Sequence, residues 1–120
     1  LLFGEQSMPL PANWYHLNDM LADGSSASSV RFVVPRAGFL RKVETTLGGA
    51  ITGADSVVTV SHSNTALSPT ITVANASSAE GDRDFAEYYR GVAAGDWIEV
   101  ATGGESTGTQ QLGITLTLSG

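Results

Sequence analysis

Cysteine is absent from this chain of 120 residues, which excludes disulfide bonds, thiol catalysis and zinc sites built on cysteine. Charged residues make up only 15% of the sequence, against about a quarter in an average globular domain. Six basic residues face twelve acidic ones, and a net charge of −6 argues against a nucleic-acid partner. No apolar run approaches the roughly 20 residues that a membrane-spanning helix needs, so we expect no membrane partner.

Histidine is also scarce, and this limits the chemistry that the chain can support. His16 and His62 are the only two, and neither lies in a spacing typical of metal ligands. A catalytic triad would need one of them beside a serine and an aspartate, but the Gly-x-Ser-x-Gly pattern of a nucleophile turn is missing. The sequence therefore predicts no enzyme activity, no metal site and no cofactor.

Three groups of side chains leave a binding role open. The acidic residues near position 80 lack the spacing of a calcium loop, and Arg83 interrupts them. The basic residues cluster in one segment, where they either face solvent or contact an acidic protein partner. The aromatic residues either form a sugar-stacking platform or pack within the domain and its subunit contacts. The three groups are Glu80, Asp82, Asp84 and Glu87; Arg31, Arg36, Arg41 and Lys42; and Trp14, Tyr15, Tyr88, Tyr89 and Trp97.

A short turn sequence, in which glycine or alanine precedes an aspartate, occurs three times, and a strand-like run follows each copy. The copies are Gly53-Ala54-Asp55, Gly81-Asp82 and Ala94-Gly95-Asp96. Glycine adopts backbone angles that other residues resist, and aspartate can hydrogen-bond the backbone at a turn. Turns at such intervals, separated by short β-rich runs, predict an all-β fold in which these aspartates serve the turns.

Alternation of apolar and polar residues predicts seven or eight strands. Residues 14–21 fit a helix or a strand, and we favour the strand. In residues 39–47 we expect Phe39, Arg41 and Val43 on one face, with Leu40 and Lys42 on the other. The last run should lie centrally, with its leucines and isoleucine facing the core. That last run is 112–118, the remaining runs are 30–34, 57–60, 70–73, 84–90 and 97–102, and 23–26 is a predicted turn.

Two packed antiparallel sheets are the expected architecture, because each strand has one apolar face to bury. We predict a jelly-roll-like sandwich over residues 14–120, with an immunoglobulin-like order as the alternative. Residues 1–13 form a predicted extended arm, since Pro9 and Pro11 disfavour regular structure. Its apolar side chains, which should lie against the domain or a partner, are Leu1, Leu2, Phe3, Met8 and Leu10.

Four segments follow one another in a particular order: Val34-Pro35-Arg36-Ala37-Gly38-Phe39-Leu40-Arg41-Lys42-Val43, Leu47-Gly48-Gly49-Ala50-Ile51-Thr52-Gly53-Ala54-Asp55, Ala79-Glu80-Gly81-Asp82 and Val92-Ala93-Ala94-Gly95-Asp96-Trp97-Ile98-Glu99-Val100. With them, residues 30 to 118 resemble small capsid decoration (cement) proteins of tailed bacteriophages. The order and spacing of the segments are more specific than the individual turns. The resemblance implies a β-sandwich or jelly-roll body, commonly assembled as a homotrimer on the outer surface of the capsid.

The resemblance implies a structural virion protein that binds the major capsid protein and stabilises the head. Two alternatives remain: a receptor- or glycan-binding head of a phage fibre, and a small enzyme or carbohydrate-binding domain cut from a longer chain. For the decoration protein, we expect the arm and the aromatics beside it to make the contact. The candidate partner-binding residues are Leu1, Leu2, Phe3, Met8, Leu10, Trp14, Tyr15 and Arg36.

Overall fold

The computed structural model describes residues 14–21, 28–103 and 110–120, so the predicted arm 1–13 and turn 23–26 lie outside the described residues. The described ranges form nine strands and contain no helix that could span a membrane. The all-β prediction is confirmed, and the additional strand is the short β5. The strands are β1 (Trp14–Leu21), β2 (Ser28–Val33), β3 (Gly38–Leu47), β4 (Ser56–His62), β5 (Thr65–Ala66), β6 (Ile71–Val73), β7 (Arg83–Val92), β8 (Trp97–Thr102) and β9 (Leu112–Ser119).

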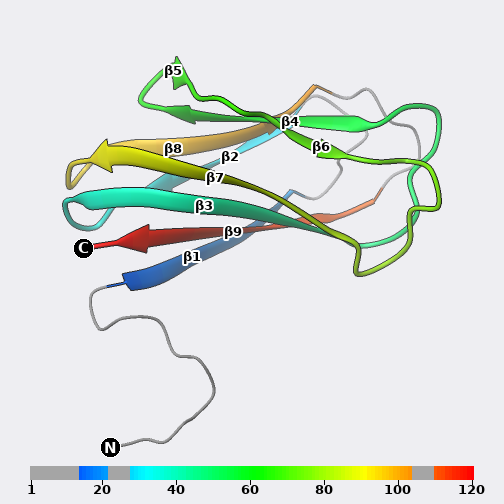
Figure 1. The fold of residues 1–120 in the computed structure, drawn as a ribbon, viewed down its shortest axis with the longest axis horizontal. Helices are drawn as coiled ribbons and strands as arrows, with labels where there is room; N and C mark the ends of the chain where they lie inside the picture. The colour runs from blue at the N-terminus through cyan, green and yellow to red at the C-terminus, as the bar shows by residue number, and fades with distance from the viewer. Residues whose placement is uncertain (1–13, 22–27, 104–109) are drawn as a thin grey trace, which may run out of the picture.

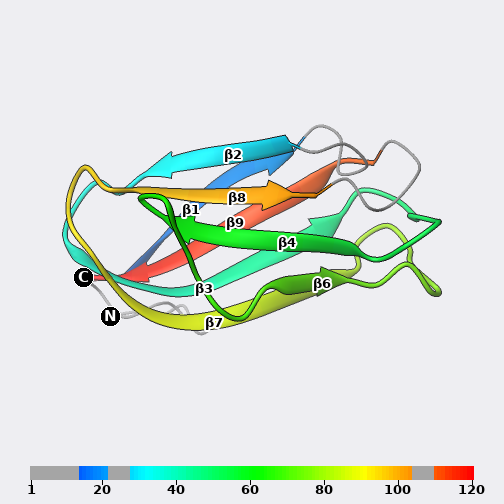
Figure 2. The ribbon, with the colours of Figure 1, turned by 90° about the horizontal axis from the view of Figure 1, so that it is seen from above.

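The strands form two antiparallel sheets in a sandwich-like arrangement. The four-stranded sheet has the order β1-β9-β3-β7, and the five-stranded sheet has the order β2-β8-β4-β5, with β6 also paired to β4. The pairing is nested along the chain: β1 pairs with β9, β2 with β8 and β3 with β7. Figure 1 shows blue β1 beside red β9, and Figure 2 shows the same neighbours from above. This order fits the jelly-roll-like prediction.

The core lies between the sheets and follows the predicted alternation most clearly in β9. Leu112, Ile114, Leu116 and Leu118 are at most 2% exposed, and β9 lies between β1 and β3 as expected. These side chains belong to one continuous cluster with those of the other sheet. The residues that the five-stranded sheet contributes include Val58, Val60, Ile71, Val73, Ile98 and Val100. Burial of such side chains is the main force that holds two sheets together.

The predicted alternation in β3 is wrong at one point, where a β-bulge changes its phase. Leu40 pairs with Leu118 and Lys42 with Thr117, so Arg41 has no opposite residue in β9. Leu40 and Val43 are both fully buried, although they are three positions apart and cannot share a face in a regular strand. The bulge resolves this conflict, because it adds one residue between them and lets both side chains enter the core.

Two Ala-x-Gly-Asp turns, at 79–82 and 93–96, flank β7 and have the same geometry. In each, the aspartate amide donates to the alanine carbonyl, at 3.2 Å for Asp82 and 3.1 Å for Asp96. The aspartate carboxylate accepts the alanine amide, at 2.9 Å in both turns. Gly81 and Gly95 have φ of +91° and +90°, which a type II turn requires at its third residue. The prediction that the aspartates serve their turns is confirmed for Asp82 and Asp96. The Asp55 carboxylate instead accepts the backbone amide of Asn75 at 2.9 Å and its side-chain amide at 2.8 Å.

Candidate functional site

The outer face of the four-stranded sheet exposes most of the large apolar side chains on the described surface. Met20 is 51% exposed, Phe39 36%, Phe85 57% and Tyr89 72%. The one comparable side chain elsewhere in the described residues is Val33, 67% exposed on β2 of the other sheet. Large apolar side chains that are exposed singly are normal on a protein surface. Several exposed aromatics on one face are instead typical of a binding surface.

The bulge in β3 determines how this face is charged. With one extra residue in the strand, the adjacent Arg41 and Lys42 both line the outer face. The Arg41 guanidinium carbon lies 4.9 Å from the centroid of the Trp14 ring and 5.0 Å from that of Tyr89. The Lys42 Nζ lies 5.2 Å from the centroid of the Phe85 ring. Each such cation–π contact is worth about 0.5–1 kcal/mol at an exposed site, so the rings hold the cations in place.

A second feature of this face is a parallel stack of rings. Phe39 and Tyr89 lie with their centroids 4.6 Å apart and their planes 6° from parallel. Gly91 stands opposite Phe39 in the register, and a Cβ at this position would come to 3.7 Å from the Phe39 ring. The absence of a side chain there leaves the ring room to lie flat. Phe39, Tyr89 and Arg41 therefore form one packed surface unit.

A trough of about 410 Å³ crosses this face and takes residues from all four strands. Its walls combine an indole, two cations, a carboxylate and a hydroxyl, so it can bind apolar and polar groups together. No ion pair among the described residues involves Arg41 or Lys42. The residues that line the trough are Trp14, His16, Arg41, Lys42, Glu87, Tyr88 and Thr117.

A second hollow, of about 570 Å³, is lined by the 66–68 segment and by residues 87–90 of β7, which include Tyr88 and Tyr89. The Tyr88 hydroxyl donates to the Pro69 carbonyl at 2.6 Å, which ties the segment to β7. Burial raises the pKa of Tyr88 to about 12, so its hydroxyl keeps its proton at neutral pH. The hydroxyl therefore has a structural role.

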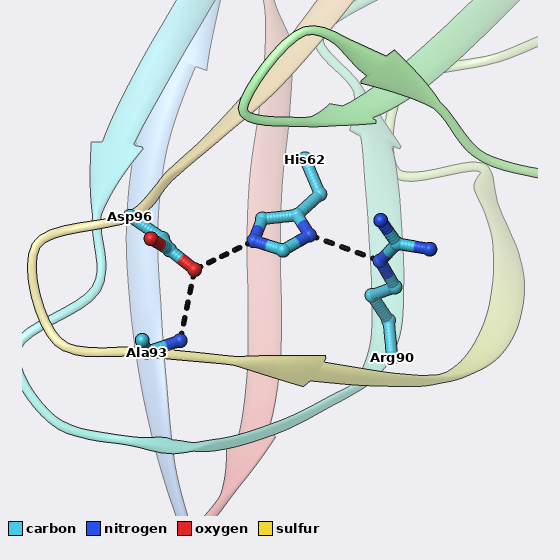
Figure 3. Close-up of polar contacts among 4 residues, drawn as sticks. All are labelled: His62, Arg90, Ala93 and Asp96. Carbon is cyan, nitrogen blue, oxygen red and sulfur yellow. Dashed lines mark hydrogen bonds and ion pairs between the residues drawn. The ribbon is translucent and has the colours of Figure 1, made fainter.

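His62, at the end of β4, forms a network with the side chains of Arg90 and Asp96 and the Ala93 amide (Figure 3). The Arg90 Nε donates to His62 Nδ1 at 2.9 Å, and His62 Nε2 lies 2.7 Å from Asp96 Oδ2. Because Arg Nε is only a donor, Nδ1 must accept and the ring proton is assigned to Nε2, which donates to Asp96. The Ala93 amide and the His62 hydrogen bond lower the pKa of Asp96.

This network contains an aspartate–histidine pair like that of a hydrolase triad, but its geometry prevents the same chemistry. A general-base histidine needs a free acceptor nitrogen facing the nucleophile. In His62 that nitrogen already accepts from Arg90. The pair instead joins β4, β7 and the 93–96 turn, which makes it a structural contact.

The acidic residues near position 80 do not converge on one point. Asp82 accepts the Ala79 amide within its own turn, and Asp84 lies on β7. Burial, and secondarily the charge of Asp82, raise the pKa of Asp84. Within the described residues, no group of three or more histidine, aspartate or glutamate side chains is placed to hold a metal ion.

The candidate partner-binding residues fall in different places. Trp14 lines the trough, whereas Tyr15 packs against the core and its hydroxyl is buried without a partner among the described residues. The Arg36 guanidinium carbon lies 4.5 Å from the centroid of the Tyr15 ring. Burial raises the pKa of Tyr15, and the Arg36 charge opposes this effect. The five remaining candidates, Leu1, Leu2, Phe3, Met8 and Leu10, lie outside the described residues.

Sequence reasoning missed the importance of Phe39 and Phe85, and it treated Arg41 and Lys42 only as part of a basic segment. A usable signal was present in Leu40-Arg41-Lys42-Val43. Two polar residues between two apolar ones break the period of a regular strand and favour a bulge. Trp97, considered with the other aromatics, lies in the five-stranded sheet, where the Arg31 guanidinium carbon is 5.3 Å from its ring centroid.

Comparison with known proteins identifies the fold and no family. No protein-family model matches the chain, and no curated protein matches it. The catalytic unit of a GH87 α-1,3-glucanase from Streptomyces thermodiastaticus is similar in structure, with a TM-score of 0.53 and 16% identity. The match covers 89% of this chain and 26% of that one. At this identity the likeness shows a shared fold alone.

Two further solved structures are more distant. An isomalto-dextranase of Arthrobacter globiformis T6, complexed with panose, has a TM-score of 0.46 and 18% identity over 78% of this chain and 18% of its own. A serine protease of Aeromonas sobria has a TM-score of 0.45 and 9% identity over 95% of this chain and 28% of its own. In all three matches the chain spans less than a third of the other protein's length.

Proposed function

We propose that this chain is a capsid decoration protein, which binds the major capsid protein on the outer surface of a phage head as a homotrimer and stabilises the head. The observation that supports attachment most directly is the exposed aromatic and cationic face of the four-stranded sheet. Phe39, Phe85, Tyr89 and Arg41 are of the residue types that dominate binding energy at protein interfaces. The capsid protein is chosen as the partner because the series of segments between residues 30 and 118 resembles decoration proteins.

The mechanism is mechanical and needs no catalytic group. Each copy buries its aromatic face, and its arm if the arm binds as expected, on neighbouring capsid subunits. Modest single contacts then add to a durable hold, because copies joined in a trimer bind with a high effective concentration. A trimer would also protect sheet edges such as β1 and β7 from uncontrolled pairing.

The test is occupancy on purified heads that lack the protein, with the double variant F85S/Y89S. Both side chains are more than half exposed, so the change should leave the fold intact while removing two contact residues. We expect at least about tenfold lower occupancy, since interface aromatics commonly contribute 2 kcal/mol or more. V33S is the matched control, because Val33 is an exposed apolar residue on the other sheet.

Wild-type occupancy by F85S/Y89S would show that this face does not attach the protein. Failure of the wild-type chain to bind heads, or to be present in virions at copy numbers that fit capsid symmetry, would overturn the decoration function itself. A variant lacking residues 1–13 tests the arm separately, and we expect weaker binding and less heat-resistant particles.

A second candidate function is glycan binding, by the same fold acting as a receptor-binding head. The observation that favours it is the trough, where the Trp14 indole borders hydrogen-bonding groups such as Glu87 and Thr117. A glycan array should then give signals that W14A abolishes. W97F is the control, because Trp97 lies in the other sheet. A blank array with the folded wild-type chain would remove this candidate.

A further inference from the structure

Two cations in the trough form none of the ion pairs or side-chain hydrogen bonds that Arg31, Arg83 and Arg90 form. Arg31 pairs with Glu99 at 3.4 Å, Arg83 with Glu44 at 3.9 Å, and Arg90 donates to His62. Arg41 and Lys42 lie beside aromatic rings and form no ion pair among the described residues, although Glu87 stands opposite Lys42 in the register. Adjacent like charges repel, and partial burial reduces the solvation of each. An anion bound between them would relieve both effects.

The geometry keeps these cations available to a ligand. The bulge makes both line the trough, and contacts with Trp14 and Tyr89 position the Arg41 guanidinium. A guanidinium held in this way can bind a carboxylate through two parallel hydrogen bonds with little further loss of side-chain entropy. The strands beneath are rigid elements of the sheet. The cation pair is therefore pre-organised for a carboxylate.

The rest of the trough fits a hydroxyl-rich ligand. Its volume of about 410 Å³ lies in the range of small-molecule sites, about 300–1,000 Å³. Glu87 can accept hydrogen bonds from hydroxyl groups, Thr117 and His16 can donate or accept, and the Trp14 indole provides an apolar wall. A doubly charged phosphate would be repelled by Glu87, whereas a singly charged sugar acid has hydroxyls for it.

We propose that the trough binds a carboxylate-bearing sugar of an acidic polysaccharide. The carboxylate lies between Arg41 and Lys42, the apolar side of the ring contacts Trp14, and the hydroxyls reach Glu87 and Thr117. This assignment rests on the second candidate function, glycan binding, and names the ligand class. It uses the same face as the proposed attachment to the head, so the two are alternatives for this face, and attachment is tested separately by occupancy.

The experiment is calorimetric titration of the full chain with tetragalacturonate, an alginate tetrasaccharide and a hyaluronan tetrasaccharide. The methyl ester of tetragalacturonate is the uncharged control. We expect at least one acidic probe to bind, and added salt to weaken its binding. For tetragalacturonate we expect about tenfold or more weaker binding of the ester, because charge-assisted hydrogen bonds are worth about twice neutral ones.

The double variant R41Q/K42Q should reduce binding of the acidic probe about tenfold or more and leave binding of the uncharged ester unchanged. R31Q is the matched control, because it removes an exposed arginine from the other sheet. Thermal unfolding of each variant confirms that the fold is retained.

Three results would overturn the proposal. Equal binding of acid and ester, unaffected by R41Q/K42Q, would leave glycan binding standing and remove the carboxylate site. Absence of binding to all three acidic probes would remove the sugar ligand. Loss of head occupancy in R41Q/K42Q, without any saccharide binding, would assign the cation pair to carboxylates of a protein partner instead.

Discussion

The 79–82 and 93–96 turns share a backbone and differ in their surroundings. Gly81 donates to the Leu47 carbonyl and Gly95 to the Val34 carbonyl, both at 2.8 Å, so each turn docks beside a strand end in the same way. Asp82, however, lies near the acidic Asp84, whose pKa it helps to raise. Asp96 instead accepts a hydrogen bond from His62, which Arg90 supports. The same turn therefore places one aspartate beside a like charge and the other in a network of favourable hydrogen bonds.

The largest expected loss of stability comes from removing each of the two turn carboxylates in a separate variant. D82A loses one hydrogen bond to a backbone amide, worth about 1 kcal/mol, which lowers Tm by about 4 °C or more. D96A loses the equivalent bond and also leaves His62 Nε2, in a side chain only 12% exposed, without its acceptor. We expect a clearly larger fall in Tm for D96A, measured by thermal unfolding.

A double-mutant cycle with H62A checks the cause of this difference. If the His62 contact accounts for it, D96A and H62A should be strongly non-additive, whereas D82A and H62A should add. Equal Tm values for D82A and D96A would show that the network contributes nothing beyond the turn.

A loss of stability smaller than that of D96A, and equal in the two turns, is expected from G81A and G95A. Both glycines have a positive φ near 90°, and a Cβ at either would meet no atom within 4 Å. The cost is therefore purely conformational, about 1–2 kcal/mol in each case. Urea unfolding should give the same loss for both within error. A clear inequality would mean that the two backbones are not equivalent.

The smallest effect is on the pH dependence of stability, where Asp96 in one turn and Asp84 beside the other turn should have opposite signs. The folded-state pKa of Asp96 lies below the ordinary value of 3.8, so its stabilisation is present above pH 3.8 and is lost as pH falls through the folded pKa. D96N should therefore be less stable than wild type at neutral pH, and the gap should close in acid.

Asp84 provides the matched case. Its folded-state pKa lies above 3.8, so its charge opposes folding at neutral pH and the cost disappears as pH falls through the raised pKa. D84N should be slightly more stable than wild type at pH 7 and equal to it below pH 3.8. Stability curves against pH that shift in the same direction for D84N and D96N would contradict the assigned environments.

Much of the fold could be predicted from local patterns. The alternation in β9 predicted both its buried face and its central position, and Pro35 correctly limited β2. Which side chains of β3 face the core could not be predicted from the alternation alone, because Leu40 and Val43 both enter the core only if the strand contains a bulge. Jelly-roll-like and immunoglobulin-like orders also remained open, since both satisfy the same strand faces.

The candidate site was less predictable than the fold. Trp14 was proposed as a contact residue and lines the trough, but its proximity to Arg41 depends on β9 lying between β1 and β3. The exposure of Phe85 and Tyr89 likewise follows from which face of β7 meets the core. No spacing along the chain indicates these contacts, because their residues come from different strands.

The sequence by itself determined the all-β class, the turns at Gly81-Asp82 and Gly95-Asp96, and the buried face of the last strand. These features depend on backbone preferences and side-chain polarity within a few residues. Tertiary structure alone decided that Asp96 meets His62, 34 residues earlier, and that four strands assemble the trough. The physical reason is that strand order is selected by burial of all apolar faces together, an energy that no short segment contains.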